Sequence, residues 1–191
     1  MSSNAPDALL FITPGCPHCP VVLQGLADLI KEGAIGALEV VNVAEHPERA
    51  AELGVRSAPW TRIGNYVLQG AQSPAELKQW ASRAASGEGD SEYLRELLGS
   101  GQLNEAEAYI REAPERLKGI LPLLEDTEAP MQIRVGVGAL LEGQAGSNQL
   151  QALIPELGSL SQHEDHRIRG DACHYLGLTA SEEAISYLEK R

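Results

Sequence analysis

The chain has 191 residues, 43% of them hydrophobic, and carries a net charge of −12 at pH 7. This length is sufficient for two small domains with separate cores. The acidic charge argues against nucleic acid and anionic membranes as partners, and no apolar run approaches the roughly 18 residues of a membrane span. The N-terminus lacks a basic region followed by an apolar core, so we expect a cytoplasmic protein.

The first predicted elements surround a pair of cysteines. An apolar strand at residues 9–12 precedes the octet Thr-Pro-Gly-Cys-Pro-His-Cys-Pro, and a segment with helical spacing follows at residues 21–30. Cys16 therefore lies at the start of a helix, where unpaired N–H groups and the helix dipole should lower its pKa below about 8.5. We predict that Cys16 attacks a disulfide and that Cys19, one turn further on, resolves the mixed disulfide.

The dipeptide between the cysteines, Pro17-His18, is expected to tune this dithiol. His18 supplies a partly cationic imidazole and N–H donors beside the Cys16 sulfur, which favours the reduced thiolate form. The pair should therefore be relatively oxidising, and an oxidant or isomerase remains an alternative to a reductant.

The Cys-x-x-Cys spacing is also found in zinc sites and structural disulfides. A zinc site needs four ligands, but no second pair is present and the remaining cysteine, Cys173, lies in a different part of the chain. We therefore predict no metal and no cofactor. An exposed pair at a helix start is a poor structural staple, and in a reducing compartment a dithiol is usually catalytic or redox-sensing.

The remainder of the first half predicts a strand, a helix, a hairpin and a final helix. Their positions are residues 37–43 (strand), 45–53 (helix), 60–63 and 66–69 (hairpin strands joined by Gly64-Asn65), and a helix capped by Ser73 with Pro74 at its first position. The order is therefore βαβ followed by ββα.

This order, with Cys-x-x-Cys at the first strand-to-helix junction, resembles the thioredoxin and glutaredoxin superfamily over residues 7–84. The resemblance implies that Pro59 is a cis-proline lying against the Cys16 sulfur. It also implies that the backbone of Ala58 binds a substrate peptide as an added strand. A trans proline that opens a strand is the alternative.

Three positions favour the small glutaredoxin-like thioredoxins within this superfamily. Gly15 stands where thioredoxins usually have tryptophan, Leu10 stands where they have a buried acid, and Pro20 follows the second cysteine. The resemblance implies a protein disulfide as substrate, with electrons from an upstream dithiol reductant or glutathione. Oxidants of the DsbA type share the Pro-His dipeptide but have a helical insertion within the fold, whereas here the helices follow it.

Domain boundaries are predicted from a change in composition. Residues 86–91 are small and polar, as in a linker, and separate a domain at residues 1–85 from one at residues 92–191. The first 85 residues carry 6 basic and 8 acidic side chains, a net charge of −2, whereas residues 86–191 carry 9 and 19, a net charge of −10. The acidic second half has helical spacing throughout.

A repeat of 35 residues organises this second half. It relates Ile133-Arg134 to Ile168-Arg169 and Leu141 to Leu176. The segment 165–172 resembles a HEAT repeat of the short bacterial kind, so we predict an all-α HEAT-like solenoid that binds a partner or substrate protein. The alternative is that these helices only stabilise or dimerise the enzyme. The recurring arginines are interpreted as caps or salt bridges within the repeat.

A group of potential metal ligands lies in the same region: His163, Asp165, His166, Cys173 and His174. Adjacent helical residues point about 100° apart, so Cys173 and His174 do not converge on one ion. Cys173 is therefore interpreted as a small buried hydrophobic residue.

Taken as a whole, the sequence predicts a thiol-disulfide oxidoreductase whose α/β thioredoxin-like domain carries the chemistry and precedes a helical binding domain. The competing interpretation is a non-catalytic redox-sensing adaptor, in which the dithiol controls partner binding by the helices.

Overall fold

The computed structural model describes residues 5–189; residues 1–4 and 190–191, at the outer ends of the two predicted domains, lie outside the described residues. The chain divides into two compact units, residues 1–89 and 90–191. The first is an α/β unit and the second is built from helices, which confirms the predicted fold class at this level. None of the helices within residues 5–189 is long and apolar enough to cross a membrane.

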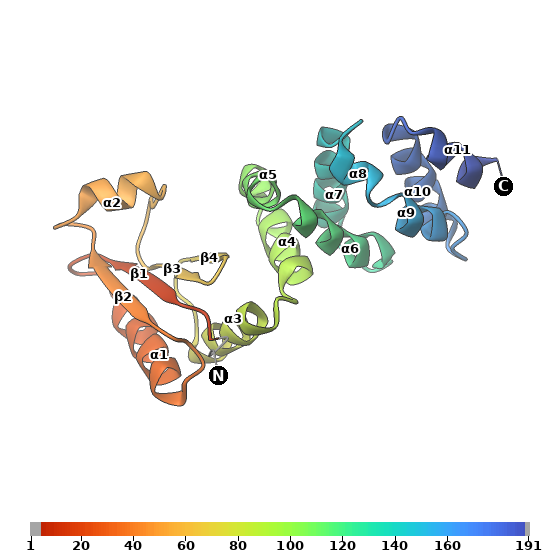
Figure 1. The fold of residues 1–191 in the computed structure, drawn as a ribbon. Coiled ribbons are helices and arrows are strands. Elements are labelled where there is room, and N and C mark those ends of the chain that lie inside the picture. Colours follow the sequence, from red (N-terminus) through yellow and green to blue (C-terminus); the bar gives the residue numbers. More distant parts are fainter. Residues whose placement is uncertain (1–4, 190–191) are drawn as a thin grey trace. The chain divides into compact units, whose positions relative to one another are not determined.

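All secondary-structure elements predicted for the first unit are present, with boundaries shifted by a few residues (Figure 1). They are β1 (Ala8–Ile12), α1 (Cys19–Glu32), β2 (Leu38–Asn42), α2 (Pro47–Glu52), β3 (Trp60–Ile63), β4 (Tyr66–Gln69) and α3 (Pro74–Ser86). The strand order in the sheet is β2-β1-β3-β4. β1 is parallel to β2 and antiparallel to β3, and β3 is antiparallel to β4.

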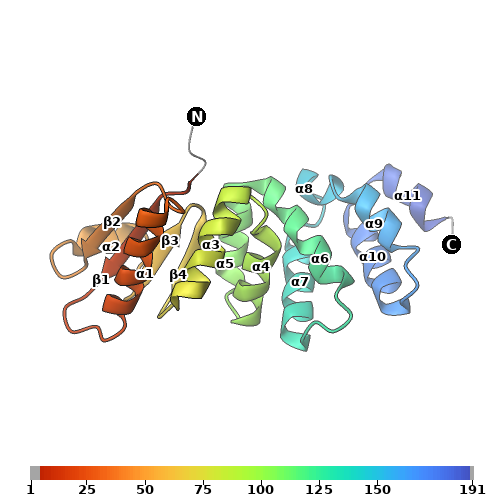
Figure 2. The same cartoon turned by 90° about the horizontal axis from the view of Figure 1, so that it is seen from below.

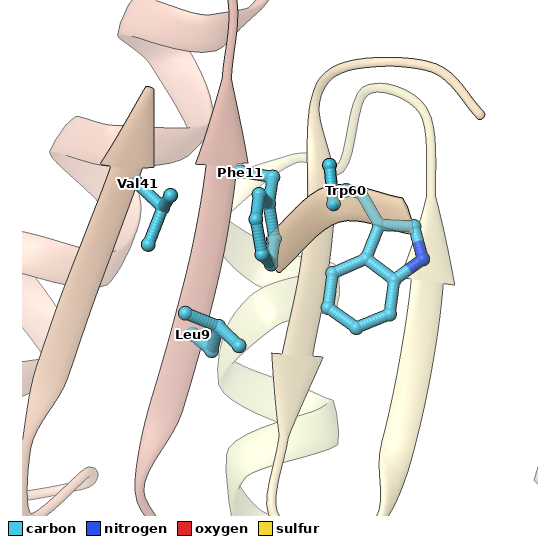
Figure 3. Close-up of a cluster of buried hydrophobic side chains, with 5 residues drawn as sticks. Leu9, Phe11, Val41 and Trp60 are labelled. Atoms are coloured by element: carbon cyan, nitrogen blue, oxygen red, sulfur yellow. The ribbon is translucent and has the colours of Figure 1, made fainter. Parts of the chain in front are cut away.

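The two faces of this sheet are covered by different helices. Leu9, Phe11, Val41 and Trp60 form a buried cluster with Ala50 of α2 (Figure 3), and the rings of Phe11 and Trp60 meet edge to face with centroids 5.5 Å apart. Side chains alternate along a strand, so the intervening residues of β1 and β3 point to the opposite face. That face is covered by α1 and α3 (Figure 1).

The second unit is a succession of short helices (Figure 2). They are α4 (Asp90–Gly99), α5 (Leu103–Glu112), the 3₁₀ helix η1 (Pro114–Ile120), α6 (Leu121–Glu125), α7 (Met131–Gly143), α8 (Asn148–Gln151), α9 (Ile154–Leu160), α10 (His166–Leu178) and α11 (Glu182–Leu188). Residues 114–125 form η1 followed by α6 instead of one continuous α-helix. Pro122 explains the break, because it has no N–H for the helical hydrogen bond to the preceding turn.

The segment between the two units is shorter than the sequence predicts. Helix α3 continues to Ser86 and α4 begins at Asp90, which leaves Gly87–Gly89 outside helices in place of residues 86–91. A tertiary contact accounts for the early start of α4, since Asp90 Oδ1 accepts a hydrogen bond of 2.6 Å from the Tyr109 hydroxyl of α5. Local composition alone does not reveal this contact.

The 35-residue period has a direct counterpart in α7 and α10. Shifting the bounds of α7 by 35 residues gives the bounds of α10. The same shift maps every buried residue of α7 onto a buried residue of α10, the pairs being Ile133 and Ile168, Val137 and Ala172, Leu140 and Tyr175, and Leu141 and Leu176. The two helices therefore bury the same face.

Candidate functional site

The two cysteines of the Cys-x-x-Cys motif are joined in a disulfide after the turn that leaves β1. The N–H of Cys16 donates to the Thr13 carbonyl at 3.3 Å, which closes this turn, and the Cα atoms of Cys16 and Cys19 are 5.5 Å apart. Cys16 is partly exposed, whereas Cys19 is buried with 5% of its surface exposed. This difference matches an attacking sulfur that substrates can reach and a second sulfur inside the domain.

The start of α1 places a backbone donor on the Cys16 sulfur. His18 is the N-cap residue, its side chain makes no capping hydrogen bond, and Pro20 occupies the first turn. The N–H of Cys19 donates to Cys16 Sγ at 3.1 Å. A donor at this position favours negative charge on the sulfur, because a hydrogen bond and the helix dipole both stabilise a thiolate.

Pro17 and His18 lie at the surface of this turn, and both are exposed. Both residues therefore lie at the surface between the two cysteines of the disulfide. Their predicted roles in tuning the dithiol stay predictions.

The loop before β3 has the cis peptide bond expected between Ala58 and Pro59. Pro59 is buried, and its carbonyl accepts a hydrogen bond of 2.9 Å from the N–H of Gly70. Ala58 is partly exposed, and neither its N–H nor its carbonyl has a backbone partner among residues 5–189. A backbone group without a partner at the end of a strand can pair with an added peptide strand.

The histidine-rich part of the second unit is organised around the start of α10. The carboxylate of Asp165 caps this helix by accepting from the Arg167 N–H at 2.8 Å. Hydrogen bonds from the Arg167 side chain and then from its backbone lower the pKa of Asp165 to about 2. Arg169 donates to the carbonyls of His163 and Glu164 at 2.8 and 2.7 Å, which holds the loop before the helix.

The remaining members of this group do not gather around one point. His174 Nε2 lies 3.6 Å from Glu142 Oε1. Cys173 is half-buried, so the prediction that it is a buried hydrophobic residue is wrong: it lies outside the face of α10 that packs in the core. Within the part of the chain that the structure describes, no three His, Cys, Asp or Glu side chains are grouped closely enough to hold a metal ion.

One polar side chain in the sheet domain was missed by the sequence analysis. Thr61 in β3 is fully buried, and its hydroxyl has no hydrogen-bond partner among the described residues. Threonine is common in strands, so the sequence carries no signal that this hydroxyl is buried next to apolar neighbours.

Comparisons with known proteins identify the first unit. The family model described as a thioredoxin domain matches residues 9–82. A protein named thioredoxin from Methanocaldococcus jannaschii is 35% identical over 59 residues, which make up 30% of this chain and 69% of that protein. The residues that the family model matches include both cysteines, and the two comparisons confirm that the α/β unit is thioredoxin-like.

Proposed function

Because the chain belongs to the thioredoxin family, we propose that it is a thiol-disulfide oxidoreductase acting on protein disulfides through Cys16 and Cys19. The observation that carries the proposal is the hydrogen bond of 3.1 Å from the Cys19 N–H to Cys16 Sγ. A structural disulfide does not need a backbone donor on one of its sulfurs. A sulfur that attacks and leaves as a thiolate is stabilised by such a donor.

The reaction proceeds through two exchanges of sulfur partners. The Cys16 thiolate attacks one sulfur of the substrate disulfide, and the other substrate sulfur leaves with the electron pair as a thiolate. The Cys19 thiolate then attacks Cys16 Sγ, which forms the Cys16–Cys19 bond and releases the second substrate sulfur. The dithiol thus gives two electrons and two protons to the substrate. An upstream dithiol reductant or glutathione would return the pair to the reduced form.

Substrate binding is assigned to the backbone of Ala58 beside Pro59. The support is the absence of a backbone partner for Ala58 among the described residues, together with its partial exposure. An extended substrate segment would pair with it as an added strand, which fixes the substrate cysteine relative to Cys16. Pro17 and His18 would border this segment, and the imidazolium form of His18 would favour the thiolate.

For the helical unit we propose a HEAT-like repeat that binds a partner or substrate protein. The support is the 35-residue equivalence of α7 and α10, in their bounds and in their buried residues. Stacked helix pairs of this kind bury one face against their neighbours and leave the other face for binding. Arg169 stands at the position where arginine recurs in the repeat. Its side chain donates to two carbonyls of the loop before its own helix, which is a structural role. We assign the whole protein to the cytoplasm, where cellular reductants keep dithiols reduced.

The proposal is tested by turnover with matched cysteine variants. Wild-type protein supplied with a small dithiol should reduce an excess of a protein disulfide such as insulin. Cys16→Ser should abolish this activity, because serine at neutral pH provides no comparable nucleophile. Cys173→Ser is the matched control and should retain full activity, since Cys173 lies in α10. A wild-type protein that forms its disulfide but never turns over would instead indicate a redox-sensing adaptor.

A further inference from the structure

A buried hydroxyl without a partner is an unusual feature of the sheet domain. Burying Thr61 Oγ1 away from water and from any acceptor lowers the stability of the fold, so its presence calls for an explanation. Among the described residues, Glu156 Oε2 is the other buried side-chain oxygen without a hydrogen-bond partner. Its carboxylate nevertheless has a charged neighbour, because the other oxygen lies 3.6 Å from Lys118 Nζ. Thr61 therefore stands out among the described residues.

The register of the sheet places Thr61 close to the end at which the dithiol lies. Thr61 is opposite Leu10 in β1 and Leu68 in β4, both buried and without a side-chain acceptor. It follows Pro59 by two residues, at the end of the sheet where β1 leads into the Cys16 turn. Because its neighbour Trp60 joins the cluster on the α2 face, Thr61 points to the opposite face, which α1 and α3 cover.

Cys19 opens α1, one of the two helices that cover that face, just after the turn that follows β1. It is the first residue of α1 and has 5% of its surface exposed. A thiol in this environment resists ionisation, because burial disfavours the charged form. Among the described residues of the sheet domain, Thr61 is the only buried Ser, Thr, Asn, Gln or charged side chain.

We propose that Thr61 is a positioning residue for Cys19, whose sulfur accepts a hydrogen bond from the Thr61 hydroxyl once the disulfide is open. This inference rests on the proposed function. During resolution the Cys19 proton passes to water, and the thiolate held by Thr61 attacks Cys16 Sγ. The bond from Cys16 to the substrate sulfur breaks, and that sulfur leaves with the electron pair. Thr61 keeps its own proton throughout, and the Cys19 thiolate is a stronger acceptor for its hydroxyl than the sulfur of the closed disulfide.

The test separates the two exchanges in time. Reduced protein carrying Cys173→Ser, in which Cys16 and Cys19 are the remaining thiols, is mixed with the disulfide reagent DTNB in a stopped-flow instrument. The first release of coloured thiol then reports attack by Cys16, and the second reports resolution by Cys19. Thr61→Val keeps the shape of the side chain and removes the hydroxyl. It should slow the second phase about tenfold and leave the first unchanged, since a hydrogen bond to a charged sulfur is lost. Thr61→Ser restores the hydroxyl and should resolve within about twofold of wild type.

Thr179→Val is the matched control in the helical unit. The Thr179 hydroxyl is also fully buried but donates to the Leu176 carbonyl at 2.6 Å, so its loss should leave both phases unchanged. Resolution by Thr61→Val at the wild-type rate would overturn the inference. So would equal slowing in Thr61→Ser, because packing would then be the cause. A wild-type protein with no first phase would overturn the proposed function, and this inference with it.

Discussion

Helices α1 and α3 begin in the same domain, and both have proline in the first turn, yet their N-terminal donors are used differently. At α3, the Ser73 hydroxyl accepts from the Glu76 N–H at 3.3 Å and Glu76 Oε2 accepts from the Ser73 N–H at 2.7 Å. At α1, the N-cap side chain of His18 accepts nothing, and the N–H of Cys19 donates to Cys16 Sγ.

This difference shows that the unsatisfied N–H groups of a helix start can serve either the fold or the chemistry. At α3 they are closed within a capping box, which stabilises the helix and lowers the pKa of Glu76 through its hydrogen bonds from Ser73. At α1 the same kind of donor meets a sulfur whose charge changes during exchange. Changes around α3 should therefore alter stability alone, whereas changes at the start of α1 should alter the redox chemistry.

The largest effect is expected in the core contact that α3 makes. Leu77 is fully buried, and Leu77→Ala should reduce the free energy of unfolding by about 3 kcal/mol, since it removes buried surface and leaves a cavity. Denaturant unfolding followed by tryptophan fluorescence measures this, because Trp60 and Trp80 both lie in the sheet domain. Leu53→Ala, at a side chain that is 39% exposed, is the control and should change stability little. A changed reduction potential in folded Leu77→Ala protein would contradict the comparison.

A smaller effect is expected at the start of α1, where a substitution should change the pKa of Cys16 and not the stability of the fold. His18→Asp introduces an anionic acceptor that competes for the donors near Cys16 and repels a thiolate, so the pKa of Cys16 should rise by about one unit. This corresponds to about 1.4 kcal/mol less stabilisation of the thiolate. The ultraviolet absorbance of the thiolate across a pH titration measures the change, with His18→Asn as the uncharged control. An unchanged Cys16 pKa in the aspartate variant would contradict the role assigned to this helix start.

The capping box of α3 provides the matching test on the structural side. Ser73→Ala removes the acceptor for the Glu76 N–H and should cost about 1 kcal/mol of stability. The reduction potential and the rate of attack by Cys16 should stay at their wild-type values. Chemical unfolding and DTNB kinetics on one preparation measure both quantities. A loss of stability in His18→Ala as large as that in Ser73→Ala would break the comparison, since His18 makes no capping hydrogen bond.

The smallest effect concerns a helix start in the second unit. Asp165 caps α10, whereas the position 35 residues earlier, Pro130 at α7, has no capping side chain. The lowered pKa of Asp165, about 2, means that its contribution is present above its unfolded pKa near 3.9 and is lost as pH falls through about 2. Asp165→Asn should therefore be less stable than wild type at pH 7, and the difference should vanish in strong acid. Helical circular dichroism during thermal unfolding at each pH measures this, and salt should weaken it.

The sequence by itself determined the order of the elements in the sheet domain and the place of the dithiol within it. The apolar run of β1, the turn residues Gly64-Asn65 and the cap at Ser73 are local signals that all favour the same order of elements. The period of 35 residues was equally visible, because the apolar positions of α7 and α10 repeat in the chain. The cis bond before Pro59 was predicted through the family resemblance.

Only the tertiary structure decided which polar groups are buried and which hydrogen-bond partners they have. That Asp90 begins a helix depends on Tyr109, and that Thr61 has apolar neighbours on both sides depends on the pairing of β3 with β1 and β4. Pairing between distant segments is fixed by the packing of the whole domain and is not written in the residues adjacent to either position. The cysteines could therefore be found by reading the chain, whereas the hydroxyl proposed to assist Cys19 required the folded sheet.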